Sequence, residues 1–234
     1  MTVRPAGRTT SLLEGPGGLL EFTTTGSGLP ATVFAHGLTG SIETTRPFGS
    51  GVKGSRTFLH FRGYGASTAQ ETPWTYPALA DELRAVADHV GATQALGVSM
   101  GAGALCALLA HTPLRFERLV FVLPAALDRP RTDDALDHPA LSASALSASA
   151  LSASALSGAV PLTDRGVLTA VTAPALVIAQ EQDAEHPVWV AQELAASLPD
   201  AHLEILPPGG ILLRHRDVMR DLIGGFLSGE RVNV

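Results

Sequence analysis

A serine between two glycines is the feature of this sequence with the clearest chemical meaning. The segment Gly97-Val98-Ser99-Met100-Gly101 follows an apolar stretch and precedes a stretch rich in alanine and leucine. A sharp turn from a strand into a helix strains the serine backbone, exposes its Oγ and leaves no room for side chains two positions away. The helix behind it directs N–H groups and the positive end of its dipole at the site. The pattern predicts a nucleophile elbow with Ser99 as the nucleophile.

An α/β architecture is needed to hold such a serine, and the apolar pattern predicts one. Strands are expected at residues 19–24, 31–35, 56–61, 94–98, 118–123, 175–179 and 202–206. Helices are expected at residues 76–90, 101–111, 190–198 and 218–226. Strands that alternate with helices imply a mostly parallel sheet with helices on both faces. Ligands of such sheets bind at the carboxyl ends of the strands.

Residues 125–165 interrupt this alternation, and we interpret them as a reduced cap or lid within one domain spanning residues 1–234. Here Leu-Ser-Ala-Ser-Ala repeats place leucines at positions 141, 146, 151 and 156. Successive leucines are turned by about 140° on a helix, so the repeat fits neither one helix face nor a strand. An expanded surface loop without a function is the alternative.

Composition narrows the function classes. Hydrophobic residues make up 45% of the 234 residues and charged residues 16%, which suits a parallel sheet buried on both faces. The net charge of -6 argues against a nucleic-acid partner, and no apolar run is long enough for a membrane helix. A single cysteine excludes an intramolecular disulfide, and no phosphate-binding loop or metal-ligand pattern is present, so we expect no cofactor. With no signal peptide recognised, a cytoplasmic location is expected.

Two further loops make the sequence resemble the α/β-hydrolase family. His36-Gly37 follows the strand at 31–35, and the segment 60–67 is similar to the family's Asp-x-Arg-Gly-x-Gly-x-Ser loop, with His60 in place of the aspartate. The resemblance implies that the backbone N–H groups of Leu38 and Met100 form an oxyanion hole. It also implies a structural role for His36, with a role as base as the less favoured alternative.

The acid of a catalytic triad is expected at Asp183. The resemblance places it after the strand at 175–179, with His186-Pro187 following at the usual distance, and the order serine then acid fits the family. Glu181 is the substitute candidate. His186 itself, like His138, His202 and His215, shows no regular ligand spacing and is interpreted as a scattered polar residue.

The catalytic histidine is expected after the last strand, but Ile211 stands there, or Gly210 in a shifted alignment. Isoleucine cannot take a proton from Ser99. His215, four residues further on, is the candidate for an atypical base, although a surface or capping role fits it better. The triad is therefore expected to be incomplete, and an Ile211→His change to raise activity.

Three functions remain open for a site with these residues. The first is hydrolysis of a small ester, thioester or lactone through Ser99, and the second is a non-hydrolytic lyase or cyclase acting on a small, polyketide-like molecule. The third is a catalytically silent binding protein. In each case the partner is a small molecule, and the residues expected to contact it are Leu38, Met100, His36 and Ile211. The sequence does not indicate an oligomeric state.

Overall fold

An eight-stranded, mostly parallel sheet forms the centre of the protein. The computed structural model describes residues 10–68, 74–130, 156 and 158–230. The strands are β1 (Ser11–Gly15), β2 (Gly18–Thr25), β3 (Ala31–Ala35), β4 (Ser55–Leu59), β5 (Gln94–Val98), β6 (Arg118–Val122), β7 (Ala175–Gln180) and β8 (Ala201–Leu206). Their order is β1-β2-β4-β3-β5-β6-β7-β8. The β1–β2 and β2–β4 pairs are antiparallel, and all the others are parallel. The α/β fold class predicted from the sequence is confirmed.

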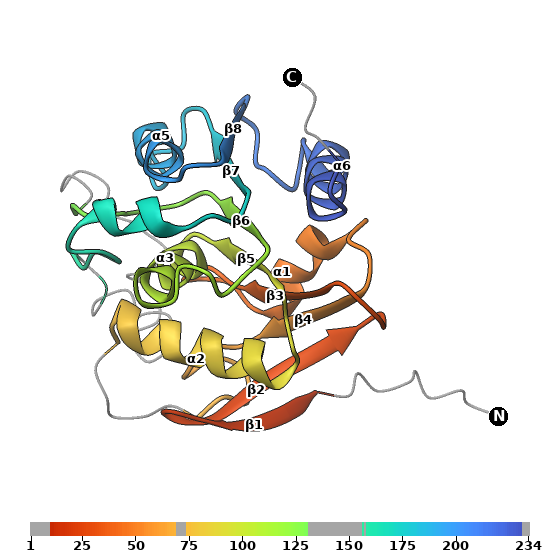
Figure 1. Cartoon of the computed structure of the whole chain (residues 1–234). Helices are drawn as coiled ribbons and strands as arrows, with labels where there is room; N and C mark the ends of the chain where they lie inside the picture. Colours follow the sequence, from red (N-terminus) through yellow and green to blue (C-terminus); the bar gives the residue numbers. More distant parts are fainter. Residues whose placement is uncertain (1–9, 69–73, 131–155, 157, 231–234) are drawn as a thin grey trace, which may run out of the picture.

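Helices cover both faces of this sheet (Figure 1). The helical elements are α1 (Ile42–Thr45), η1 (Arg46–Gly49), α2 (Tyr76–His89), α3 (Met100–His111), η3 (Arg165–Ala170), α5 (Val188–Ser197) and α6 (Arg216–Leu227). One face carries α2, α3 and α5, and the other carries α1 and α6. Since parallel strands end at the same edge, the loops that follow β3, β5 and β7 meet there.

The core has two parts because the central strands are buried on both faces. In β7 the residues at odd positions, such as Val177, belong to the cluster under α2, α3 and α5, whereas Leu176 and Ile178 belong to the cluster under α1 and α6. This alternation is the period of two expected of a strand. All six residues of β7 are buried, which explains why the sequence shows a continuous apolar run there.

The expected elements agree with the observed ones to within about two residues at most ends. The sequence did not indicate β1, α1, η1 or η3, which are short. Most of the segment interpreted as a cap, including Leu141, Leu146 and Leu151, lies outside the described residues. The described flanks are tied together by a hydrogen bond from the Leu162 N–H to the Leu127 carbonyl, 3.0 Å long.

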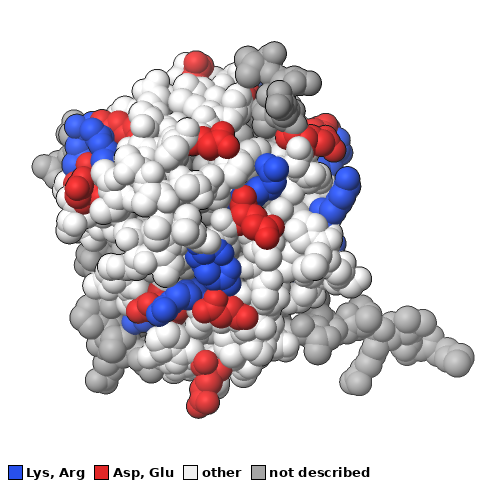
Figure 2. All heavy atoms as spheres, in the orientation of Figure 1, with Lys and Arg blue, Asp and Glu red and all other residues white. Residues whose placement is uncertain are grey.

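Charged side chains of both signs lie side by side on the face shown in Figure 2. Several charged residues form ion pairs, such as Arg115 with Asp88 at 2.7 Å. Within the described part of the chain, no helix combines the length and apolar character needed to cross a membrane.

Candidate active site

Ser99 occupies the turn between β5 and α3 with a strained backbone. Its φ of 51° and ψ of -109° lie outside the regions that side-chain-bearing residues normally adopt. Its N–H donates to the Val122 carbonyl at 2.9 Å, so the strained turn is held by β6. The residue is partly exposed, as a nucleophile requires.

Both glycines of the elbow are needed for close backbone packing. A Cβ added to Gly97 would lie 2.4 Å from the Gly101 carbonyl oxygen, and one added to Gly101 would lie 2.5 Å from the Ala35 carbonyl oxygen. Any side chain there would push α3 away from β3 and β5. The local geometry therefore agrees with the elbow predicted from Gly-x-Ser-x-Gly.

Left-handed backbone recurs at this edge of the sheet. Among the described residues, the non-glycine positions with positive φ are Ser99, Leu123 and Gln182, with φ values of 51°, 50° and 57°. Ser99 and Leu123 directly follow β5 and β6, and Gln182 lies two residues after β7. Such conformations cost about 1–3 kcal/mol each and persist where surrounding contacts impose them.

The hydrogen-bond partner of Ser99 is His186, which lies in the loop between β7 and α5. His186 Nε2 is 2.9 Å from Ser99 Oγ, and His186 Nδ1 is 3.0 Å from Asp183 Oδ2. With Nδ1–H donating to the carboxylate, Nε2 is free to accept the serine O–H proton. The serine hydroxyl, the imidazole and the carboxylate are therefore joined by two consecutive hydrogen bonds, which is the geometry of a catalytic triad.

The loop that carries Asp183 folds back on itself to hold this geometry. Asp183 Oδ1 accepts the N–H groups of Glu185 and His186 at 3.0 and 3.1 Å. Burial raises the pKa of Asp183, but the His186 ring and the two N–H groups outweigh it, so the pKa lies below its ordinary value. The carboxylate stays ionised and able to orient the imidazole.

The loop after β3 lies against the elbow. A Cβ on Gly37 would be 3.3 Å from Ser99 Cβ. His36 Nδ1–H donates to the Gly37 carbonyl at 2.7 Å, and the Tyr64 hydroxyl donates to the Leu38 carbonyl. The Gly37 carbonyl and the Leu38 N–H belong to one planar trans peptide and point in opposite directions, so holding the first also orients the second.

Met100 supplies a second N–H beside the serine. It is the first residue of α3, and N–H groups in the first turn of a helix have no acceptor within that helix. Its side chain is buried, so only its backbone can serve the site.

Comparison with known proteins identifies the family that has this fold. A family model described as alpha/beta hydrolase fold matches residues 30–149, just over half of the chain. The chain belongs to the alpha/beta hydrolase fold family. The matched region contains the loop after β3, the 60–67 segment and the turn at Ser99, but it ends before Asp183 and His186. No curated protein matches the chain.

Solved structures share this fold over almost the whole chain. An esterase from Exiguobacterium antarcticum has a TM-score of 0.79 at 20% identity, covering 94% of this chain and 100% of its own. The carboxylesterase CesB from Bacillus subtilis has a TM-score of 0.78 at 17% identity, with coverage of 97% and 94%. A meta-cleavage product hydrolase from Pseudomonas fluorescens has a TM-score of 0.78 at 14% identity, with coverage of 94% and 97%.

The α/β-hydrolase resemblance led us to expect the base after β8, and the structure corrects this expectation. His215 Nε2 hydrogen-bonds to the Pro207 carbonyl at 2.9 Å, whereas the bond to Ser99 is made by His186. Ile211 is 8% exposed and belongs to the core cluster under α6, so its side chain packs rather than faces a ligand. The site does not lack a histidine; the histidine comes from the loop after β7.

His36 is a second correction, because it was expected to contact the substrate. Its ring is fully buried, and both nitrogens are engaged: Nδ1 donates to Gly37 and Nε2 accepts the Phe61 N–H at 3.1 Å. Burial, reinforced by His60, lowers the pKa of His36 to about 4, although the bond to Gly37 opposes this. A neutral ring is required here, because a proton on Nε2 would face the Phe61 N–H.

Sequence reasoning missed His186 although it noted the residue. The available signal was the spacing Asp-x-x-His directly after a strand and before a helix. Among the described residues, no group of three or more His, Cys, Asp and Glu side chains is arranged to hold a metal ion.

Proposed function

We propose that this protein is a serine hydrolase that cleaves a small ester, thioester or lactone. Ser99 is the nucleophile, His186 the base and Asp183 the residue that orients His186. One observation carries the proposal: the bond of 2.9 Å from Ser99 Oγ to His186 Nε2, continued by the bond of 3.0 Å from His186 Nδ1 to Asp183. The esterases among the structural neighbours agree with it.

In the first half of the reaction, His186 Nε2 takes the Ser99 hydroxyl proton as Oγ attacks the substrate carbonyl carbon. The carbonyl π electrons move to oxygen, and the N–H groups of Leu38 and Met100 stabilise the resulting oxyanion. His186 then gives its proton to the departing alkoxide or thiolate as the carbonyl re-forms. An alcohol or thiol leaves, and the acyl group stays on Ser99; a lactone opens but remains attached.

In the second half, water attacks the acyl-enzyme while His186 takes one of its protons. The same N–H groups stabilise the second oxyanion. Collapse of this intermediate breaks the bond to Ser99 Oγ, which recovers its proton from His186. The products are a carboxylic acid and the free enzyme.

The alternatives open in the sequence rested on a missing base. A lyase, a cyclase or a silent binding protein would explain a retained serine without a histidine partner. Since His186 hydrogen-bonds to Ser99, the hydrolytic function needs no other base. The site therefore favours acyl transfer over these alternatives.

Turnover of p-nitrophenyl acetate and covalent labelling by a fluorophosphonate together test the proposal. The wild-type protein should release p-nitrophenol and should be labelled at Ser99 with loss of fluoride. Ser99→Ala should lose both signals, and His186→Ala should retain the serine but react slowly with both reagents. Thr32→Val is the control for general loss of stability, because Thr32 lies near the start of β3 and the candidate site lies beyond the end of this strand. Wild-type labelling at a residue other than Ser99, or full turnover by His186→Ala, would refute the assignment.

A further inference from the structure

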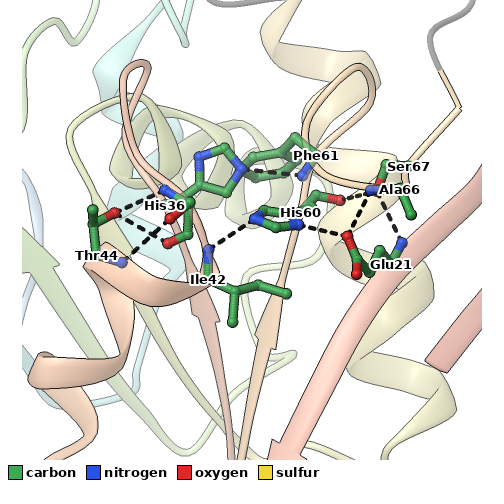
Figure 3. Close-up of polar contacts among 9 residues, drawn as sticks. Glu21, His36, Ile42, Thr44, His60, Phe61, Ala66 and Ser67 are labelled. Carbon is green, nitrogen blue, oxygen red and sulfur yellow. Dashed lines mark hydrogen bonds and ion pairs between the residues drawn. The ribbon is translucent and has the colours of Figure 1, made fainter. Parts of the chain in front are cut away.

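A buried carboxylate and histidine lie next to residues 36–42, here called the oxyanion loop because they include Leu38, the proposed oxyanion donor, and they take no part in the proposed triad. Glu21 belongs to β2, and His60 directly follows β4. Their side chains are only 11% and 8% exposed, and His60 Nδ1 is 2.8 Å from Glu21 Oε2. Figure 3 shows them in line with the backbone of Ile42.

The imidazole of His60 connects Glu21 to the far end of the oxyanion loop. Its Nδ1–H donates to the Glu21 carboxylate, and its Nε2 accepts the Ile42 N–H at 2.9 Å. Ile42 is the first residue of α1 and closes the loop that begins at His36. Only the tautomer with its proton on Nδ1 makes both bonds, because a proton on Nε2 would oppose the Ile42 N–H.

Glu21 is itself fixed by the segment that follows His60. Its Oε2 also accepts the Ala66 N–H at 2.6 Å, and its backbone N–H donates to Ser67 Oγ at 2.8 Å. The Ser67 hydroxyl donates in turn to the His60 carbonyl at 2.7 Å (Figure 3). Burial raises the pKa of Glu21, but the Ala66 N–H and His60 outweigh it and keep the pKa below its ordinary value.

Gly65 shows how closely the chain fits around this pair. Its φ is +54°, and an added Cβ would lie 2.0 Å from His60 Nδ1 and 2.2 Å from Glu21 Oε2. A side chain at this position would separate the carboxylate from the imidazole. The glycine of the 60–67 segment is therefore needed for the pair itself as well as for the turn.

The two ends of the oxyanion loop are thus held by two histidines. His36 holds the beginning through the Gly37 carbonyl, and His60 holds the end through the Ile42 N–H. The two rings meet edge to face with centroids 5.7 Å apart. Leu38, whose N–H is the proposed oxyanion donor, lies between these two fixed points.

We propose that Glu21 and His60 are positioning residues for catalysis: the carboxylate selects the His60 tautomer that holds the Ile42 N–H, and this fixes the Leu38 N–H for the oxyanion. The inference rests on the proposed hydrolase function. In this proposal both residues act through the loop and not on the substrate directly. A displacement of about 1 Å at a catalytic group costs up to about 10²-fold in rate, and loss of a whole oxyanion donor costs about 10²–10³-fold.

Kinetics of Glu21→Ala and Glu21→Gln test the positioning role. The amide oxygen of the introduced glutamine can still accept the His60 Nδ1–H, so Glu21→Gln should keep kcat within about 3-fold of wild type, whereas Glu21→Ala should lower kcat about 10- to 100-fold with little change in KM. Thr32→Val, which removes the buried bond to Gln94, is the control for stability and should leave kcat unchanged. Equal kcat values for Glu21→Ala and wild type would overturn the proposal, as would an equally low kcat in Glu21→Gln.

The His60 tautomer gives a second measurement that does not depend on turnover. Long-range ¹H–¹⁵N spectra of the imidazoles should show the proton of His60 on Nδ1 in the wild type and in Glu21→Gln, and a shift toward Nε2 in Glu21→Ala. If the wild type shows this tautomer but no hydrolysis, the proposed function fails while the pair still holds the loop. If His60 carries its proton on Nε2 in the wild type, the positioning proposal fails whatever the turnover.

Discussion

The loops after β7 and β8 leave the same edge of the sheet, but only the first supplies side chains to the serine. In the β7–α5 loop, Asp183 and His186 bond to each other and His186 reaches Ser99. In the β8–α6 loop, Ile211 is buried in the core and His215 bonds to a carbonyl of its own loop, that of Pro207. The side-chain hydrogen bonds of the first loop lead to Ser99, whereas those of the second loop stay within that loop and its Ile211 packs in the core.

This difference indicates that a histidine becomes a candidate base through its contact with Ser99 Oγ rather than through its place in the sequence. The imidazole must reach Ser99 Oγ from one side and a carboxylate from the other. The turn at Gln182 and Asp183 brings His186 into that space. With the space filled, the β8–α6 loop is free to complete the core with an isoleucine.

The largest difference is expected between two variants in which either His186 or His215 is replaced by alanine. His186→Ala should lower kcat for p-nitrophenyl acetate by about 10²–10⁴-fold, because the general base is lost. His215→Ala should leave kcat within about 2-fold, since His215 bonds to a carbonyl of its own loop. The reverse result, with His215→Ala inactive, would move the base to the β8–α6 loop.

Ile211→His should cost stability and bring no gain in turnover. The sequence alone suggested that this change would restore a base, but Ile211 lies in the core and His186 already contacts Ser99. A buried imidazole without partners should lower the free energy of unfolding by about 1–3 kcal/mol, measured by urea denaturation. Ile211→Val, which should cost about 0.5–1.5 kcal/mol, is the matched control for lost packing. A rise in kcat with an intact fold would contradict the comparison of the two loops.

The stability of the β7–α5 loop should depend on acid pH through Asp183. Its folded-state pKa is lowered, so its stabilising contribution is present above the ordinary pKa and is lost as pH falls through the folded value. Thermal unfolding between neutral pH and about pH 3 should therefore show a steeper fall for the wild type than for Asp183→Asn. His186→Ala, which removes one of the partners of Asp183, should give an intermediate slope. Identical slopes in all three proteins would show that the carboxylate is not held as described.

The smallest effect is expected on the outer surface of α5. Glu193 pairs with Arg129 at 2.6 Å and with Arg165 at 2.7 Å, and Arg129 lies 4.2 Å from the centre of the Trp189 ring. Because these groups are partly exposed, Glu193→Gln should lower the free energy of unfolding by less than about 1 kcal/mol, and added salt should reduce the difference. Asp217→Asn, which removes an exposed pair on α6, should have a smaller effect. A large, salt-independent loss would mean that α5 is anchored by something else.

The sheet and the tight Gly-x-Ser-x-Gly turn could be predicted because each leaves a local pattern, whereas Asp183 was expected from the resemblance to the α/β-hydrolase family. Buried strands are short apolar runs, and the elbow needs glycines at fixed spacing. The spacing Asp-x-x-His marks His186 only weakly, because the contact with Ser99 depends on the positive φ of Gln182 and on the N–H groups that fold back to Asp183. The bond between Glu21 and His60 joins residues 39 apart in sequence, so only the folded sheet brings them together.

The spacing of three residues between Asp183 and His186 also has a consequence for dynamics. Because the proposed base, His186, and its proposed orienting acid, Asp183, lie on one short segment with internal hydrogen bonds, movement of that segment should carry both together. Such a movement should change the distance from His186 Nε2 to Ser99 Oγ more than the distance from His186 Nδ1 to Asp183 Oδ2. A site that takes its histidine and its acid from separate loops must maintain two independent distances, from the histidine to the serine and from the histidine to the acid. Here, the proposed triad has two parts that can move relative to each other: Ser99, which follows β5, and the segment with Asp183 and His186, which follows β7.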